Sequence, residues 1–98
     1  MGECEGFDWD DGNLLKSWLK HSVTHGETEQ VFFNEPLLVK QDPEHSSGES
    51  RYHALGRTDK NRCLFVVFTV RNGLIRVISA RSANRKEKTT YEKAQNNP

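Results

Sequence analysis

The segment from Arg62 to Arg81 most constrains this fold, because its residues predict two strands joined by a tight turn. A run of β-branched and aromatic residues, Cys63–Val70, precedes Asn72-Gly73, and a second such run begins at Leu74. Asn-Gly between apolar runs favours a type I′ turn, since both central residues of that turn need a positive φ. We therefore predict a β-hairpin at the centre of the fold.

A two-residue loop in this hairpin would produce two unlike sheet faces, because side chains alternate along a strand. The predicted core face carries alternate apolar residues and ends at Ser79 and Arg81. The other face carries Arg76 in the middle of a strand, followed by Ile78 and Ala80. Arginine is rarely buried without a partner, so Arg76 requires a structural or functional explanation.

The sequence before the hairpin predicts two short helices. Apolar residues at helical spacing indicate a helix over about residues 12–21, and Phe7 to Trp9 before it could add a short edge strand. Thr24 and Glu27 have the spacing of a capping box, so we expect a second helix from there to about Phe33.

Two further strands are expected, over residues 37–39 and 51–58. Asn84 and Glu87 predict another capped helix, which ends near Ala94. This order predicts an α+β fold with a small antiparallel sheet of about four strands, two N-terminal helices and one C-terminal helix.

The length of 98 residues predicts a single domain, with a core over about residues 7–94 and flexible ends at 1–6 and 95–98. Two cysteines are too few for a disulfide scaffold, and no apolar stretch is long enough to span a bilayer. The pattern suggests a reducing, cytoplasmic setting and no membrane partner.

The formal net charge of zero conceals a strong asymmetry. Residues 1–50 hold three basic and eleven acidic residues, a balance of −8, whereas residues 51–98 hold eleven basic and three acidic, a balance of +8. A basic sheet suggests a polyanionic ligand such as nucleic acid. Alternatively, the acidic half folds against the basic half and cancels its charge. Composition leaves both interpretations open.

Two clusters contain metal-ligating residue types: Asp8, Asp10 and Asp11 before Gly12, and His21, His25 and Glu29. The glycine comes one position too early for a calcium loop, so helix capping is the better interpretation of the aspartates. A helix break at Thr24 would separate the histidines. We therefore predict no metal and no cofactor.

The remaining chemistry lies in cations around the sheet, with histidine and tyrosine among them. RNA cleavage by its own 2′-hydroxyl needs a proton acceptor, cations for the extra phosphate charge, and a donor to the leaving oxygen. These residue types supply all three. The candidate residues are Lys20, His21, Arg51, Tyr52, His53, Arg57, Arg62, Arg76, Arg81, Arg85 and Tyr91.

Several segments, in order over about residues 7–92, resemble the BrnT-type ribonuclease toxins of type II toxin–antitoxin systems. The matching segments are Phe7-Asp-Trp-Asp10, Lys20-His21, Glu27-x-Glu29-x-Val-Phe32, Arg51-Tyr52, Gly56-Arg57, Val67-Phe-Thr69 and Ile75-Arg-Val-Ile-Ser-Ala-Arg81. Ser17 and Ser22 depart from the family pattern, which has asparagine and glycine at these positions in many members.

The resemblance implies a RelE-like fold and an endoribonuclease that arrests growth, and the residue types above allow that cleavage without a metal ion. Its implied partners are RNA and a BrnA-like antitoxin with a ribbon-helix-helix DNA-binding end, through which the pair would bind operon DNA. A second copy of the chain is a further candidate partner within that complex. The family's basic positions carry over as Lys20, His21, Arg51, Arg57, Arg76 and Arg81.

The resulting hypothesis gives each candidate a role. Arg57, Arg76 and Arg81 hold the scissile phosphate, while Lys20 or His21 assists proton transfer. The RNA-binding candidates are Arg51, His53, Arg62, Arg85 and Tyr91. The alternative function is a non-catalytic RNA- or protein-binding module that acts as a co-regulator within a DNA-binding complex.

Overall fold

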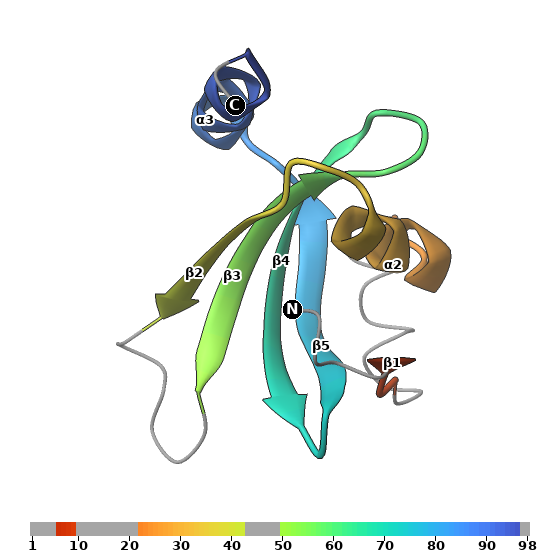
Figure 1. Cartoon of the computed structure of the whole chain (residues 1–98). Helices are drawn as coiled ribbons and strands as arrows, with labels where there is room; N and C mark the ends of the chain where they lie inside the picture. The colour runs from red at the N-terminus through yellow and green to blue at the C-terminus, as the bar shows by residue number, and fades with distance from the viewer. Residues whose placement is uncertain (1–5, 10–21, 43–49, 97–98) are drawn as a thin grey trace.

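The computed structural model describes residues 6–9, 22–42 and 50–96, which form one five-stranded sheet and two helices (Figure 1). The elements are β1 (Gly6–Phe7), α2 (His25–Phe33), β2 (Leu38–Asp42), β3 (Arg51–Arg57), β4 (Cys63–Arg71), β5 (Leu74–Ser82) and α3 (Arg85–Asn96). The strand order is β1-β5-β4-β3-β2, in which only β1 pairs in parallel.

The predicted α+β class is confirmed, but the sheet has five strands because the segment at Phe7 pairs with the edge of β5. The first predicted helix, over residues 12–21, lies outside the described residues. Strand β2 begins one residue later than expected and continues three residues beyond the predicted end, to Asp42.

The hairpin of β4 and β5 has the predicted turn. Asn72 and Gly73 have φ angles of 53° and 77°, as a type I′ turn requires. Near the turn the pairing also follows the prediction, from Arg71 opposite Leu74 to Phe68 opposite Val77.

Further from the turn, the pairing shifts by one residue. Val67 pairs with Ser79 while Phe68 pairs with Val77, so Ile78 is the extra residue of a β-bulge. The predicted faces beyond Ile78 are therefore wrong. Ala80 lies in the core with no exposed surface, and Arg81 pairs with Phe65 on the opposite face, the face of Arg76.

One sheet face is closed by α2. Thr24 and Glu27 form the predicted capping box, because the Glu27 amide donates to Thr24 Oγ1 and the Thr24 amide donates to Glu27 Oε1. Val31 from this helix and Phe68 from β4 are fully buried. The core on this side contains Val23, Val31, Ala54, Leu64, Val66, Phe68, Ile75, Val77 and Ala80.

The close packing of α2 depends on Gly56 of β3. A Cβ atom there would lie 2.6 Å from Val31 Cγ1 and 3.2 Å from the Val31 carbonyl oxygen. Glycine is the residue whose missing side chain permits this approach of helix and strand.

Among the described residues, α3 covers one end of the other sheet face, where β3 ends and β4 begins (Figure 1). Asn84 and Glu87 form the second predicted capping box, with amide-to-side-chain distances of 2.9 and 2.8 Å. Tyr91 attaches the helix, since its ring is buried and its hydroxyl donates to the Pro36 carbonyl at 2.6 Å.

Candidate functional site

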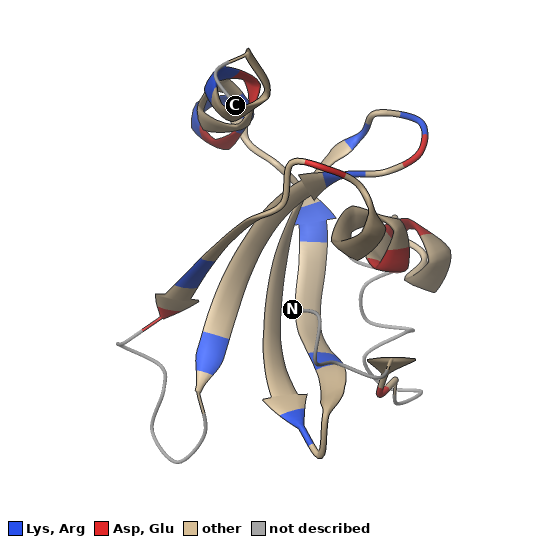
Figure 2. Cartoon of the chain, viewed as in Figure 1, with Lys and Arg blue, Asp and Glu red and all other residues tan. Residues whose placement is uncertain are grey.

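The sheet face opposite α2 carries cationic residues from four neighbouring strands, and we call it the basic face. Figure 2 shows lysine and arginine at intervals along these strands. Strand registers place the members in rows across the sheet. The cationic or potentially cationic members are Lys40, Arg51, His53, Arg57, Arg71, Arg76 and Arg81.

The first row contains Arg51 and Arg76, which pair with Thr69 from its two sides. Adjacent strands lie about 4.8 Å apart, so the backbones of the two arginines are roughly 10 Å apart. Arg76 Nη1 lies 3.4 Å from Asp8 Oδ2. The partner that Arg76 requires is therefore partly a carboxylate from the N-terminal segment.

The second row contains His53, between Lys40 of β2 and Val67 of β4. His53 Nε2 lies 3.0 Å from Asp42 Oδ2, and its side chain keeps 36% of its surface exposed while that of Asp42 keeps 9%. A histidine that donates from Nε2 leaves Nδ1 as a proton acceptor. The geometry gives an oriented imidazole that a ligand can reach.

The third row contains Phe65 between Leu55 and Arg81. The Arg81 guanidinium carbon lies 4.3 Å from the centre of the Phe65 ring, which is cation–π distance. His53 contacts the same ring, with 5.1 Å between ring centres. Phe65 thus supports both an imidazole and a guanidinium.

Glu87 of α3 holds Arg81 in place. Arg81 Nη1 and Nη2 donate to the two carboxylate oxygens of Glu87 at 2.8 and 2.9 Å. These bonds raise the pKa of Arg81 and lower that of Glu87, and the Asn84 amide adds to the lowering for Glu87. Arg81 is a permanent, fixed cation with further N–H groups available for a ligand.

The contacts of His53 and Arg81 with the Phe65 ring form a cluster on the basic face, and neither Arg57 nor Arg62 contacts that ring. Arg57 Nε donates to the Glu35 carbonyl at 3.0 Å, and both arginines line a separate pocket of about 260 Å³ beside Tyr91. Arg62 contacts Glu27 at 2.9 Å and Ser82 Oγ at 2.8 Å. Its contacts join the start of α2 to the end of β5.

The remaining predicted site residues are Lys20, His21, Arg85 and Tyr91, and they differ in where they lie. Lys20 and His21 lie outside the described residues, and Arg85 is exposed in the first turn of α3. Tyr91 is 3% exposed, which does not fit the predicted RNA contact and makes it a packing residue. Burial raises the pKa of its hydroxyl, and the Arg57 charge opposes that effect.

Asp42, Phe65 and Glu87 were absent from the predicted site. Phe65 had been treated as a strand residue and Glu87 as a helix cap, and both roles are correct but incomplete. One sequence pattern could have placed Glu87 in the site. The second capping box fixes Glu87 near the end of the strand that carries Arg81. No local pattern connects Asp42 to His53, eleven residues away.

The acidic half does neutralise part of the basic half. Asp8 contacts Arg76, Glu27 contacts Arg62 and Asp42 contacts His53, and in each pair the acid precedes residue 51. The interpretation in which the acidic half folds against the basic half therefore holds for some of these cations.

Among the described residues, no group of three histidine, cysteine, aspartate or glutamate side chains could hold a metal ion. In the cluster of His21, His25 and Glu29, the last two have other contacts. The His25 ring stacks on Trp9 with 3.8 Å between ring centres, and Glu29 accepts from Trp9 Nε1 at 2.8 Å. Among all the residues that the structure describes, no helix is long and apolar enough to cross a membrane.

The fold and face define a class: a small α+β protein with a basic antiparallel sheet face partly covered by its C-terminal helix. The family model of the BrnT ribonuclease toxins of type II toxin–antitoxin systems matches residues 9–87. The chain belongs to this family, and a toxin of this kind implies an antitoxin partner.

A solved structure agrees with the fold. The crystal structure of the ribonuclease toxin BrnT of Brucella abortus is 22% identical, with a TM-score of 0.59 over 82% of this chain and 97% of that chain. At this identity the likeness supports the fold alone. No curated protein matches the chain.

Proposed function

We propose that this protein is an endoribonuclease toxin that cleaves RNA without a metal ion and arrests growth. The observation that carries the proposal is the cluster around Phe65, where His53 and Arg81 contact one ring on the basic face. The cluster supplies an oriented proton acceptor and a fixed cation, which is the equipment that cleavage by the RNA 2′-hydroxyl requires.

His53 acts as the general base in this proposal. Asp42 lies 3.0 Å from Nε2, so it can hold the tautomer in which Nδ1 accepts the 2′-hydroxyl proton. This assignment changes the role of His53 from RNA binding to catalysis.

Arg81 stabilises the negative charge that develops on the phosphate. Glu87 and the Ser82 carbonyl occupy three of its N–H groups, and the groups that remain are available to phosphate oxygens. Arg51 and Arg76 lie further along the same face and position the RNA backbone, so Arg76 moves from the predicted contact with the scissile phosphate to RNA binding. Lys20 and His21 stay candidates for proton transfer, on the family resemblance.

The partner proposals also follow the family resemblance. The antitoxin is a BrnA-like ribbon-helix-helix protein, and DNA contacts arise through that protein in a cytoplasmic complex. The basic face is the surface that this antitoxin covers, and a second copy of the chain joins the same complex as a homodimer.

A cleavage assay tests the proposal. Purified protein is incubated with a defined RNA in the presence of EDTA, and the products are separated on a denaturing gel. We expect discrete cuts that slow by about 10²- to 10⁴-fold in His53→Ala and by about 10²- to 10³-fold in Arg81→Ala. Lys60→Ala removes an exposed cation from a turn away from the cluster and should cleave normally.

Folded His53→Ala and Arg81→Ala proteins that cleave at the normal rate would contradict the proposed roles. Cleavage that EDTA abolishes would contradict metal independence. If isolated RNA stays intact, translating ribosomes replace it in a second assay.

The second candidate function is a non-catalytic module that binds RNA or protein. Arg76 and Arg81 already contact Asp8 and Glu87 within the chain, which favours this candidate. Such a module would shift RNA on a native gel without shortening it, with or without ribosomes, and its binding would weaken steeply with salt.

A further inference from the structure

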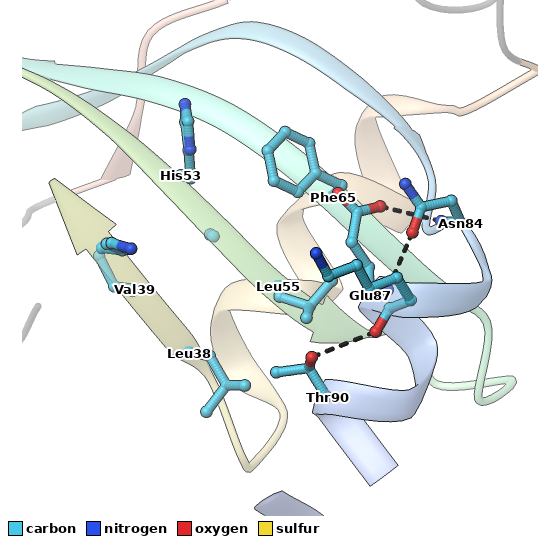
Figure 3. Close-up of a pocket in the computed structure, with 11 residues that line it drawn as sticks. Leu38, Val39, His53, Leu55, Phe65, Asn84, Glu87 and Thr90 are labelled. Carbon is cyan, nitrogen blue, oxygen red and sulfur yellow. Dashed lines mark hydrogen bonds between the residues drawn. The ribbon is translucent and has the colours of Figure 1, made fainter. Parts of the chain in front are cut away.

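A pocket of about 410 Å³ shares His53 and Phe65 with the cluster, and no ligand has yet been assigned to it. One wall comes from β2 and β3 and carries Leu38, His53 and Leu55 (Figure 3). The opposite wall comes from the start of α3 and carries Glu87 and Thr90. Pockets of about 300–1,000 Å³ are the size that small organic ligands occupy.

The inner surface of the pocket is apolar. Leu38 and Phe65 pack against a small core in which Leu55, Ala83 and Tyr91 are buried. A flat, largely apolar group can displace water from such a surface.

The rim of the pocket is cationic. Lys40 and Lys86 line it and are exposed, and His53 lines it between the pocket and the cluster. Among the described lining residues, Glu87 carries the one carboxylate, and its two bonds to Arg81 neutralise it. Asn84, also exposed, adds an amide that can bond to polar edges.

We propose that this pocket binds one nucleobase of the RNA next to the scissile phosphate, with the backbone phosphates of that nucleotide at Lys40 and Lys86. The inference rests on the proposed function for its substrate class. An apolar interior beneath a cationic rim complements a nucleotide, whose base is flat and whose phosphate is anionic. Because His53 borders both the pocket and the cluster, a base held here places the adjoining phosphate near His53.

The first test fills the pocket from α3. Thr90→Trp introduces an indole at a lining position, and Thr89→Trp places the same indole on the same helix outside the lining. The two threonines are matched, since both are exposed and each hydroxyl donates to the carbonyl four residues earlier. Cleavage rates are compared for RNAs that differ only in the nucleotide beside the cut.

We expect Thr90→Trp to lower cleavage of the preferred RNA by about tenfold and to abolish the preference among the four nucleotides. Thr89→Trp should keep the normal rate and preference. An unchanged preference in folded Thr90→Trp would overturn the proposal.

The second test requires no cleavage. The four nucleoside monophosphates and ribose 5-phosphate are titrated into the ¹⁵N-labelled wild-type protein. We expect the nucleotides to shift the amide signals of His53, Leu55 and Thr90, and ribose 5-phosphate to shift them much less. Shifts in a protein that cleaves RNA neither in isolation nor on translating ribosomes would uphold the pocket and refute the proposed function.

If the wild-type protein cleaves RNA but none of the four nucleotides shifts the amide signals of the pocket residues, the proposed nucleobase site is refuted and the proposed function is not. The same conclusion follows if Thr90→Trp retains nucleotide binding and loses only the antitoxin complex, since the occupant is then a protein.

Discussion

The two phenylalanines Phe65 and Phe68 of β4 occupy opposite faces of the sheet and have unlike surroundings. Phe68 is fully buried beneath α2, where it contacts the rings of Phe32 and Tyr52. Phe65 is half-buried on the basic face, where it supports His53 and Arg81. The comparison separates a face that stabilises the fold from a face that presents charge.

Replacing each phenylalanine by alanine should separate the two faces most strongly. Phe68→Ala should lower the free energy of unfolding by about 3–5 kcal/mol, because it leaves a cavity in a closed core. Phe65→Ala should cost clearly less stability but slow cleavage by roughly 2- to 30-fold, because Arg81 loses its cation–π support. Urea unfolding and the gel assay measure the two effects, and equal losses of stability would refute the comparison.

The packing of α2 predicts a smaller effect at Gly56. Gly56→Ala should destabilise by about 1–3 kcal/mol, since the new Cβ would overlap Val31 Cγ1. Gly26→Ala is the matched control, because a Cβ there meets its nearest atom, Thr24 Oγ1, at 3.9 Å. The control should gain about 0.4–1 kcal/mol. Thermal unfolding of both variants tests the prediction, which fails if the two shifts share a sign.

The smallest effect is expected at the ion pair of α3. Glu87→Gln preserves the capping box but removes the charge that faces Arg81. The pair is partly exposed, so the loss at neutral pH should be below about 1 kcal/mol.

This loss should also depend on pH. The bonds from Arg81 hold the pKa of Glu87 below its ordinary value of 4.5, so the wild type has this stabilisation above pH 4.5. The stabilisation disappears as the pH falls through the folded pKa. The difference in unfolding free energy between wild type and Glu87→Gln should therefore shrink in acid, and a constant difference would contradict the assignment.

Sequence alone determined the features whose causes are local. The turn at Asn72-Gly73 follows from backbone sterics, and the boxes that begin at Thr24 and Asn84 follow from side chains three residues apart. The order of the predicted helices and strands gave the class of the fold. The residue segments in family order gave the resemblance to the BrnT toxins, with which the family model agrees. Lys20 and His21 stay predictions.

Tertiary structure alone decided which cations share a face. The bulge at Ile78 shifts Arg81 to the face of Arg76, and the register of β3 with β4 adds Arg51, His53 and Arg57. A shift of one residue in strand pairing moves a side chain to the opposite face, and no local propensity specifies such a shift. The partners of these cations, such as Asp8 for Arg76, lie far away in sequence, so only the folded chain brings them together.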